Sequence, residues 1–283
     1  MVLPYSEIMK LERSYTHEWD ERDVMLYALS LGMPSDPLDE RQLAYVWERH
    51  LAVLPVFFAT IALNDSPTAH AEAVYEKFLH AGQSVTLHKP LPKSGKAVIK
   101  SRMVGVWDKG PEKGSLFRDQ SDIYLDGDDE PFASITNTAF ARADHGFGAP
   151  TEGQPKPHKA PERQPDRTTL FPTTRQQALL YRQGARDPHP LHVDAALARS
   201  VGFREPIMHG LCTFGICQRA VLGEHADFRP ESIRHIEANF TGSVYPGETI
   251  RVDTWQDGDT VSFEAFVVER DLKVIGNGKA VLV

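Results

Sequence analysis

At 283 residues the chain is long enough for one large domain or two modest ones, each with its own hydrophobic core. A net charge of −8 at pH 7 argues against nucleic acid as the main partner, because phosphate binding requires a basic field. The longest apolar run, residues 51–63, is interrupted by Pro55 and is too short to span a membrane, so we expect no membrane insertion.

Three further features predict a cytoplasmic protein. The N-terminal residues lack the charged start and apolar core of a secretory signal. Cys212 and Cys217 lie in one apolar run and are expected to be buried thiols rather than a disulfide framework. The last residues, AVLV, match no peroxisomal or endoplasmic-reticulum address.

The chain divides into two halves around a connector. Residues 1–142 begin with a helical stretch and continue as strands punctuated by Pro and Gly. Residues 143–167 contain five prolines, three glycines and almost no apolar periodicity, which predicts an exposed, semi-extended linker. Residues 168–283 form the second half, of ordinary domain size.

The two halves resemble degenerate copies of one unit. LYALSLGMPSDPLDE at 26–40 corresponds to LYRQGARDPHPLHVD at 180–194. HKPLPKSGKAVIKSRMVGVWDKG at 88–110 corresponds to GSVYPGETIRVDTWQDG at 242–258. VSFEAFVVER alternates apolar and polar residues over part of its length, as a strand does. The pattern predicts a duplicated α+β unit, with each sheet folded around its own helix.

Helix signals are clearest in the second half. Asp194 is expected to cap a helix over AALARSV, and Gly202 follows as its C-terminal glycine. Residues 210–222 place apolar side chains at helical spacing with little charge, which is typical of a helix enclosed by a sheet.

The segment RDPHPLHVD at 186–194 holds candidate catalytic groups. Asp187 and His192 flank a proline-stiffened bridge that can aim both side chains at one water, although a polar surface loop is an alternative. A metal site formed with His189 and His209 is disfavoured, because there is no HExxH, no CxxC and no clustered set of four ligands.

Gly210 stands at the predicted start of the apolar helix. Its backbone N–H is free of the helix ladder and could polarise a carbonyl, or the glycine could serve close packing alone. Nucleophile elbows, dinucleotide-binding glycine patterns and Walker loops are absent from the sequence.

LYRQGARDPHPLHVD with PIMHGLCTFG resembles the motif of the MaoC-like, (R)-specific enoyl-CoA hydratases of the two-repeat hydratase 2 type. The likeness extends to YTHEWDERDVMLYALSLG, HGFGAP and VYPGET, and so to nearly the whole chain. It implies a double hot-dog fold, with an antiparallel sheet around a long helix in each half. It also implies catalysis in the second half, an acyl-binding first half, and pairing into homodimers.

The resemblance also assigns roles to single residues. It makes Asp187 and His192 the dyad that holds the water, and the Gly210 N–H the donor to the thioester carbonyl. The remaining family contacts with the acyl-CoA fall on His80, Ala81, Lys109, His189 and Phe240. Three positions depart from the motif: His189 replaces Asn, Arg186 replaces Gly before the aspartate, and Ala81 replaces Gly.

The implied reaction is reversible hydration of a trans-2-enoyl-CoA to the (3R)-3-hydroxyacyl-CoA, with His192 favoured as base and Asp187 as proton donor. Water is the second substrate, so no metal or other cofactor is expected. A thioesterase and a non-catalytic acyl-CoA-binding protein are the alternatives. Four lysines, at 89, 93, 96 and 100, form a spaced basic series. They are candidates to help Lys109 receive coenzyme A phosphates, although a solvated strand face is the simpler interpretation.

Overall fold

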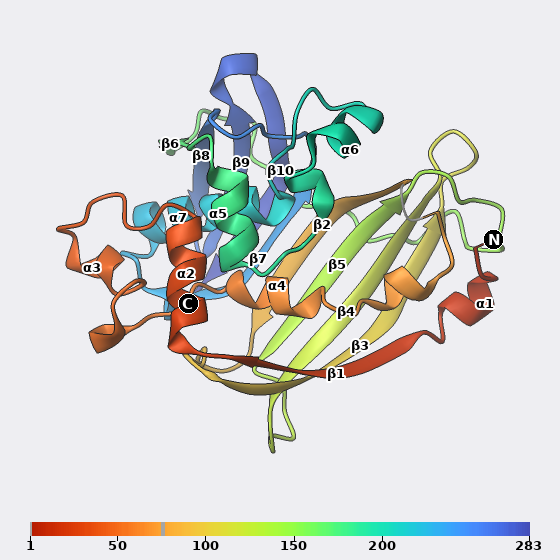
Figure 1. Ribbon diagram of the computed structural model, residues 1–283, viewed down its shortest axis with the longest axis horizontal. Helices are drawn as coiled ribbons and strands as arrows, with labels where there is room; N and C mark the ends of the chain where they lie inside the picture. Colours follow the sequence, from red (N-terminus) through yellow and green to blue (C-terminus); the bar gives the residue numbers. More distant parts are fainter. Residues whose placement is uncertain (1, 75–76) are drawn as a thin grey trace.

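The structure is a computed structural model that describes residues 2–74 and 77–283. Within these residues the strands form one continuous antiparallel sheet in the order β1-β3-β4-β5-β2-β7-β10-β9-β8-β6 (Figure 1). The first-half strands are β1 (Glu12–Trp19), β2 (Phe78–Leu87), β3 (Gly95–Asp108), β4 (Ser115–Leu125) and β5 (Ala133–Ala141). The second-half strands are β6 (Arg167–Pro172), β7 (Ile233–Phe240), β8 (Thr249–Asp257), β9 (Thr260–Val267) and β10 (Leu272–Leu282).

The two halves have equivalent strand orders, as the predicted duplication requires. Counted from its outer edge, the first half runs β1-β3-β4-β5-β2 and the second half runs β6-β8-β9-β10-β7. The halves meet where β2 pairs with β7, with Gly82 opposite Asn239 and Thr86 opposite His235. Two α+β units are therefore present, but they share one sheet rather than having two separate sheets.

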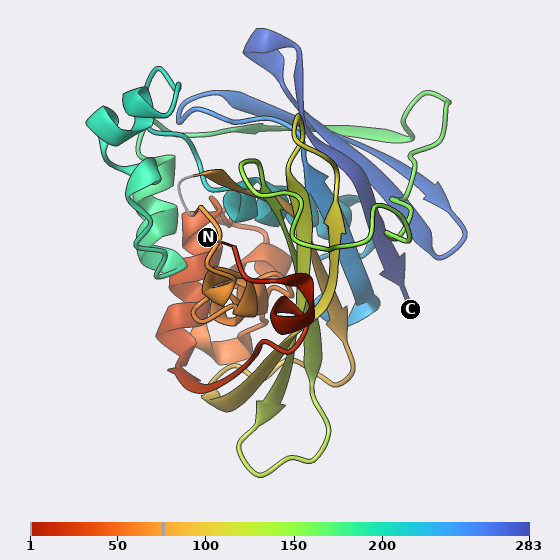
Figure 2. The same ribbon diagram turned by 90° about the vertical axis from the view of Figure 1, so that its right-hand side faces the viewer.

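The helices lie on one side of the sheet (Figure 2). They are α1 (Tyr5–Ile8), α2 (Glu21–Ser30), α3 (Glu40–Leu43), α4 (Phe57–Ala62), α5 (Gln177–Gly184), α6 (Ala195–Ser200) and α7 (Gly210–His225). The predicted linker, which has no helix or strand up to β6, runs along the other side of the sheet. Among the described residues, no helix combines the length and the apolar character that crossing a bilayer requires.

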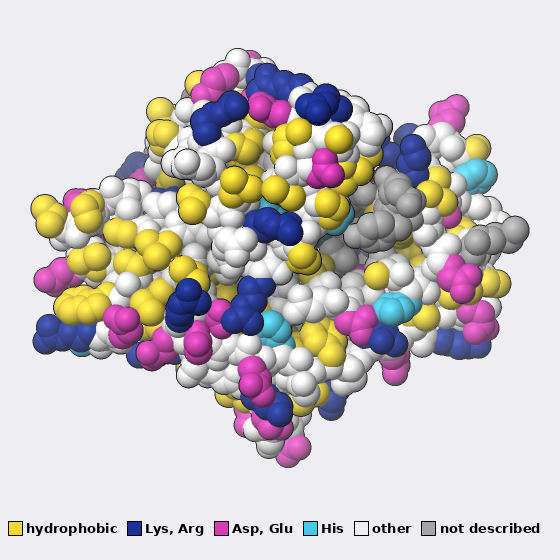
Figure 3. Space-filling view, viewed as in Figure 1, with side chains coloured by type: hydrophobic (Ala, Val, Ile, Leu, Met, Phe, Trp, Pro, Cys, Tyr) yellow, Lys and Arg dark blue, Asp and Glu magenta, His cyan; other side chains and the backbone are white. Residues whose placement is uncertain are grey.

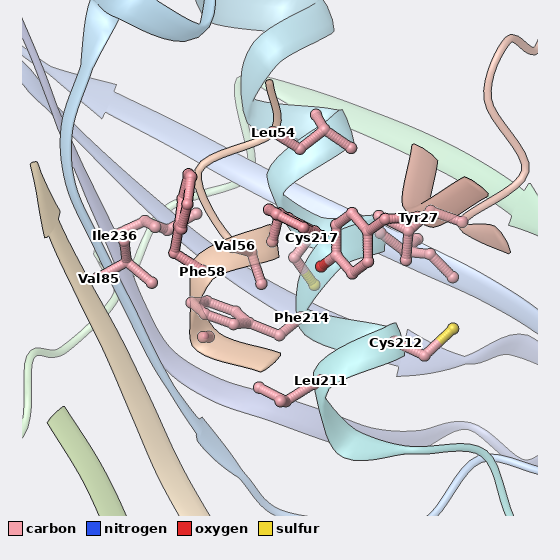
Figure 4. Close-up of a cluster of buried hydrophobic side chains, with 14 of the residues drawn as sticks. Tyr27, Leu54, Val56, Phe58, Val85, Leu211, Cys212, Phe214, Cys217 and Ile236 are labelled. Carbon is pink, nitrogen blue, oxygen red and sulfur yellow. The ribbon is translucent and has the colours of Figure 1, made fainter. Parts of the chain in front are cut away.

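Helix α7 is the centre of the core. Leu211 to Leu222 are all buried, as expected for a helix that is apolar nearly all round. Phe214 and Cys217 pack with Tyr27, Val56 and Phe58 of the first half, so both halves share one core (Figure 4). Complete burial of a side chain such as Phe58 stabilises the fold by about 1.5–3 kcal/mol.

Two polar side chains of α7 also join the halves. The Gln218 Oε1 accepts a hydrogen bond of 2.7 Å from the Val56 N–H. The Arg219 guanidinium donates to the Leu31 carbonyl and, at 2.6 Å, to the Ser35 hydroxyl. These bonds fix α7 against the first half.

The long helix expected in the first half is absent from the described residues, where a short helix takes its place. The first-half counterpart of α7 is α4, which has only 6 residues. Pro55 precedes α4 and the turn-forming run NDSP follows at 64–67, so the helix has little room to extend. The double hot-dog arrangement therefore has one long central helix, in the second half.

Helices α2 and α5, equivalent in the two halves, pack against each other. The rings of Tyr27 and Tyr181, which occupy equivalent positions in the repeats, lie 5.9 Å apart between centroids. A Cβ added to Gly184 would stand 2.6 Å from the Leu26 carbonyl oxygen, so only glycine permits this approach. The contact places the end of α5, and the catalytic segment after it, against the first half.

Candidate active site

The segment between α5 and α6 folds through local hydrogen bonds. The Asp187 Oδ1 accepts a bond of 2.9 Å from the His189 N–H, and the His189 Nδ1 accepts one of 3.3 Å from the Leu191 N–H. Arg182 donates to the carbonyls of Asp187 and His189, at 3.2 Å each. Pro188 and Pro190 prevent an α-helix here, and residues 190–192 form only a short 3₁₀ turn.

The capping predicted for the next helix is confirmed. Asp194 accepts hydrogen bonds from the Ala196 and Leu197 N–H groups at 2.8 and 3.1 Å. Gly202 follows α6 with a φ of +95°, the left-handed conformation that favours glycine. This cap fixes the C-terminal side of the catalytic segment.

Arg186, which replaces a family glycine, has a left-handed backbone with a φ of +53°. This conformation costs a non-glycine residue about 1–2 kcal/mol. The guanidinium forms an ion pair of 2.5 Å with the Asp23 carboxylate at the start of α2. Arg186, the residue before Asp187, therefore forms a contact with the first half that a glycine could not form.

His192 is held as a neutral base. Its Nδ1–H donates a bond of 2.8 Å to the Ile207 carbonyl, which can only accept, so the Nε2 carries the lone pair. Burial lowers the pKa of His192 below its ordinary value, although the nearby Asp187 carboxylate opposes this. The imidazole can thus accept a proton at neutral pH.

His209, the residue before α7, completes a cluster that the sequence did not assign. Its ring stacks on that of His192 with centroids 3.6 Å apart, and its Nε2 lies 3.8 Å from the Asp187 Oδ2. Burial lowers the pKa of His209 to about 2, so the ring is neutral. The sequence placed His209 only in the disfavoured metal alternative, although its position beside Gly210 was a usable signal.

Asp187, His192 and His209 each offer one ligand atom, and these atoms lie within 4.8 Å of one another. Such donors can bind zinc, with bonds of about 2.0–2.1 Å to nitrogen. The two imidazoles are stacked, with an interplanar angle of 26°.

Gly210 is the first residue of α7, as the sequence predicted. Among the described residues its N–H, which lies at the positive end of the helix dipole, forms no hydrogen bond. A Cβ added here would stand 3.2 Å from the Phe240 ring. The site thus combines a free donor with an apolar wall.

His80 reaches the site from the first half. The His80 ring lies 4.6 Å from the Phe240 ring between centroids, and its Nε2 bonds to the Gln83 Oε1 at 2.9 Å. Burial lowers the pKa of His80 to about 4. The pairing of β2 with β5 shifts register at Ala81, whose carbonyl accepts a bond of 3.3 Å from Asn239.

The predicted lysines lie elsewhere. Lys109 follows β3, and its Nζ donates to the Thr151 carbonyl at 3.4 Å; no described contact joins it to Asp187 or His192. Lys89 and Lys96 form ion pairs with acidic residues, and Lys100 lies over the Tyr124 ring. Figure 3 shows basic and acidic side chains intermingled on the face it displays. These contacts favour the simpler interpretation of the series as a solvated face.

The fold and the site together define a double hot-dog protein with a carboxylate–imidazole site beside the seam of its repeats. The MFE-2 hydratase 2 N-terminal domain matches residues 17–143, and the MaoC like domain matches residues 155–278. Enoyl-CoA hydratase ChsH3 of Mycobacterium tuberculosis is 36% identical over 266 residues, which cover 92% of this chain and 91% of that protein. The chain belongs to the MaoC-like hydratase 2 family.

Two solved structures are similar over most of the chain. A MaoC-like dehydratase from Phytophthora capsici has a TM-score of 0.88 at 28% identity, covering 98% of this chain and 97% of that one. Full-length peroxisomal multifunctional enzyme type 2 from Drosophila melanogaster has a TM-score of 0.82 at 30% identity. The match covers 96% of this chain but only 48% of the Drosophila protein.

Proposed function

We propose that the chain catalyses the reversible syn hydration of trans-2-enoyl-CoA to (3R)-3-hydroxyacyl-CoA. The observation that carries the proposal is the convergence of the Asp187 carboxylate with the His192 imidazole, whose free Nε2 can act as a base. The similar protein of M. tuberculosis is named an enoyl-CoA hydratase and the Phytophthora protein a dehydratase, the two directions of one reaction.

The Gly210 N–H supplies the electrophilic part of the mechanism. It donates to the thioester carbonyl, which makes C3 of the enoyl group more electrophilic. As water adds to C3, negative charge develops on the carbonyl oxygen, and the same N–H stabilises it. Phe240 and His80 form the wall beside this donor.

The dyad moves the protons. The His192 Nε2 takes one proton from the water as its oxygen bonds to C3. Asp187, which enters the reaction as the carboxylic acid, gives its proton to C2 on the same face. A proton then moves from the His192 imidazolium to Asp187, which restores both groups. The net reaction is the addition of one water across the C2–C3 double bond. Because water is the second substrate, this chemistry requires no resident cofactor.

His189 acts in this scheme through the loop. Its N–H holds one oxygen of Asp187, and its ring accepts the Leu191 N–H. Its backbone thus orients Asp187 although the family asparagine is absent. Lys109 remains a candidate contact for the coenzyme A part of the substrate.

We also propose a cytoplasmic location, a homodimer, and division into repeats 1–142 and 168–283 joined by linker 143–167. Light scattering of the purified protein would test the dimer, for which a mass near 63 kDa is expected, twice the 31.7 kDa of one chain. A mass of one chain at micromolar concentration would refute it.

The first experiment is to incubate the protein with crotonyl-CoA and with trans-2-decenoyl-CoA. Loss of the conjugated enoyl absorbance and chiral analysis of the product should show the (R)-3-hydroxyacyl-CoA. Asp187→Asn and His192→Ala should each lower kcat by about 10²–10⁴-fold, the range of general acid–base catalysis. Free thiol without a hydroxy product would indicate a thioesterase, and binding without turnover would indicate an acyl-CoA-binding protein.

A further inference from the structure

His209 is the least expected polar group of the site. It is only 2% exposed, and neither ring nitrogen has a hydrogen-bond partner among the described residues. Burying an unpaired imidazole costs free energy that an apolar residue of similar size would avoid. An unpaired buried polar group beside a reactive dyad is a candidate for contact with the attacking water.

The geometry identifies a small partner. Three atoms that lie within 4.8 Å of one another share a point no more than about 2.8 Å from each, which is hydrogen-bonding distance for a water. The atoms belong to Asp187, His192 and His209. A water at this point would be within hydrogen-bonding distance of all three residues.

The hydrogen-bonding roles follow from the neighbours. His192 presents a lone pair at Nε2, because its Nδ1–H is bonded to the Ile207 carbonyl. The His209 Nε2 faces the Asp187 Oδ2 at 3.8 Å, and this acceptor favours the tautomer with the proton on Nε2. His209 thus presents a donor where His192 presents an acceptor.

We propose that His209 is a third catalytic residue, whose Nε2–H donates to the oxygen of the water that attacks C3. The water would give one hydrogen to His192, and His209 would occupy one of its two lone pairs. The remaining lone pair is then directed at the substrate. In the dehydration direction the same N–H stabilises the departing hydroxide. This inference rests on the hydratase function proposed above.

The test compares His209→Gln with His209→Met in hydration of crotonyl-CoA. The two side chains have the same length, but only glutamine keeps an N–H near the position of the imidazole Nε2. We expect His209→Met to lower kcat by about 10- to 100-fold, the effect of losing one hydrogen bond to a group that becomes charged. KM should change less than about twofold, and His209→Gln should recover at least about fivefold of the lost kcat.

Met208→Leu is the matched control, because Met208 is a buried apolar neighbour outside the catalytic machinery. Equal losses in Met208→Leu and His209→Met, or a glutamine variant no better than the methionine variant, would overturn the proposal, since packing alone would explain them. A methionine variant with kcat within threefold of wild type would do the same. Absence of hydration by the wild-type protein would instead refute the proposed function itself.

Discussion

Lowering the pH should decrease the free energy of unfolding, in part because His209 is buried as a neutral imidazole. His209→Met should remove the part of this decrease that is due to His209. The pKa of this buried imidazole is lowered to about 2 in the folded protein, against an ordinary value of 6.5. Below pH 6.5 the unfolded chain therefore binds a proton that the folded chain cannot bind. The resulting loss of stability begins near pH 6.5 and grows until the pH approaches 2.

The size of the effect follows from the same values. At 1.36 kcal/mol per pH unit, the span from pH 6.5 to pH 5.0 gives about 2 kcal/mol for His209. His80, with a folded pKa of about 4, adds a similar loss over this span. Methionine does not titrate, so His209→Met should lose about 2 kcal/mol less than the wild type between pH 8 and pH 5.

Urea unfolding followed by tryptophan fluorescence at pH 8.0 and pH 5.0 measures this difference. Each protein is compared with itself at the two pH values, so the loss of packing in the variant cancels. Met208→Leu, which changes no titratable group, should show the wild-type dependence. If the wild type and His209→Met lose the same free energy within about 0.5 kcal/mol, His209 is not held neutral by burial and the reasoning is wrong.

Three further changes test other parts of the site. Gly210→Ala places a Cβ 3.2 Å from the Phe240 ring, so kcat/KM for crotonyl-CoA should fall about tenfold while the unfolding free energy changes by less than about 1 kcal/mol. Asp194→Ala removes two capping bonds of α6 and should cost about 1 kcal/mol in urea unfolding, whereas an unchanged midpoint would show that the cap is dispensable. Lys109→Glu should raise KM for decenoyl-CoA at constant kcat, and an unchanged KM would remove Lys109 from the substrate contacts.

Much of the site depends on short-range chemistry and was predictable. Asp187, His192 and Gly210 lie within one stretch of 24 residues, where prolines, an N-cap and a helix start determine the local conformation. In the structure, Gly32 of the first half has a φ of +79°, and Arg186, at the equivalent position of the second half, has a φ of +53°. The repeat thus preserved a left-handed turn even where the residue changed.

The tertiary structure decided what distant segments do together. The sequence predicted two helices and two sheets, but pairing of β2 with β7 made one sheet, and the turn formers after α4 left one long helix. The ion pair of Arg186 with Asp23 and the contact of His80 with Phe240 cross between the halves, over more than a hundred residues of chain. No periodicity or spacing encodes such contacts, because they depend on how the halves pack.

The sequence by itself determined which segments could carry the chemistry: the stiff loop with its carboxylate and imidazole, and the free amide at the start of α7. Only the fold decided that His209 stacks on His192 and faces Asp187, without a hydrogen-bond partner among the described residues. The reason is physical. Local hydrogen bonds and backbone preferences act over a few residues, whereas burial and the convergence of side chains arise only when the two halves share a core.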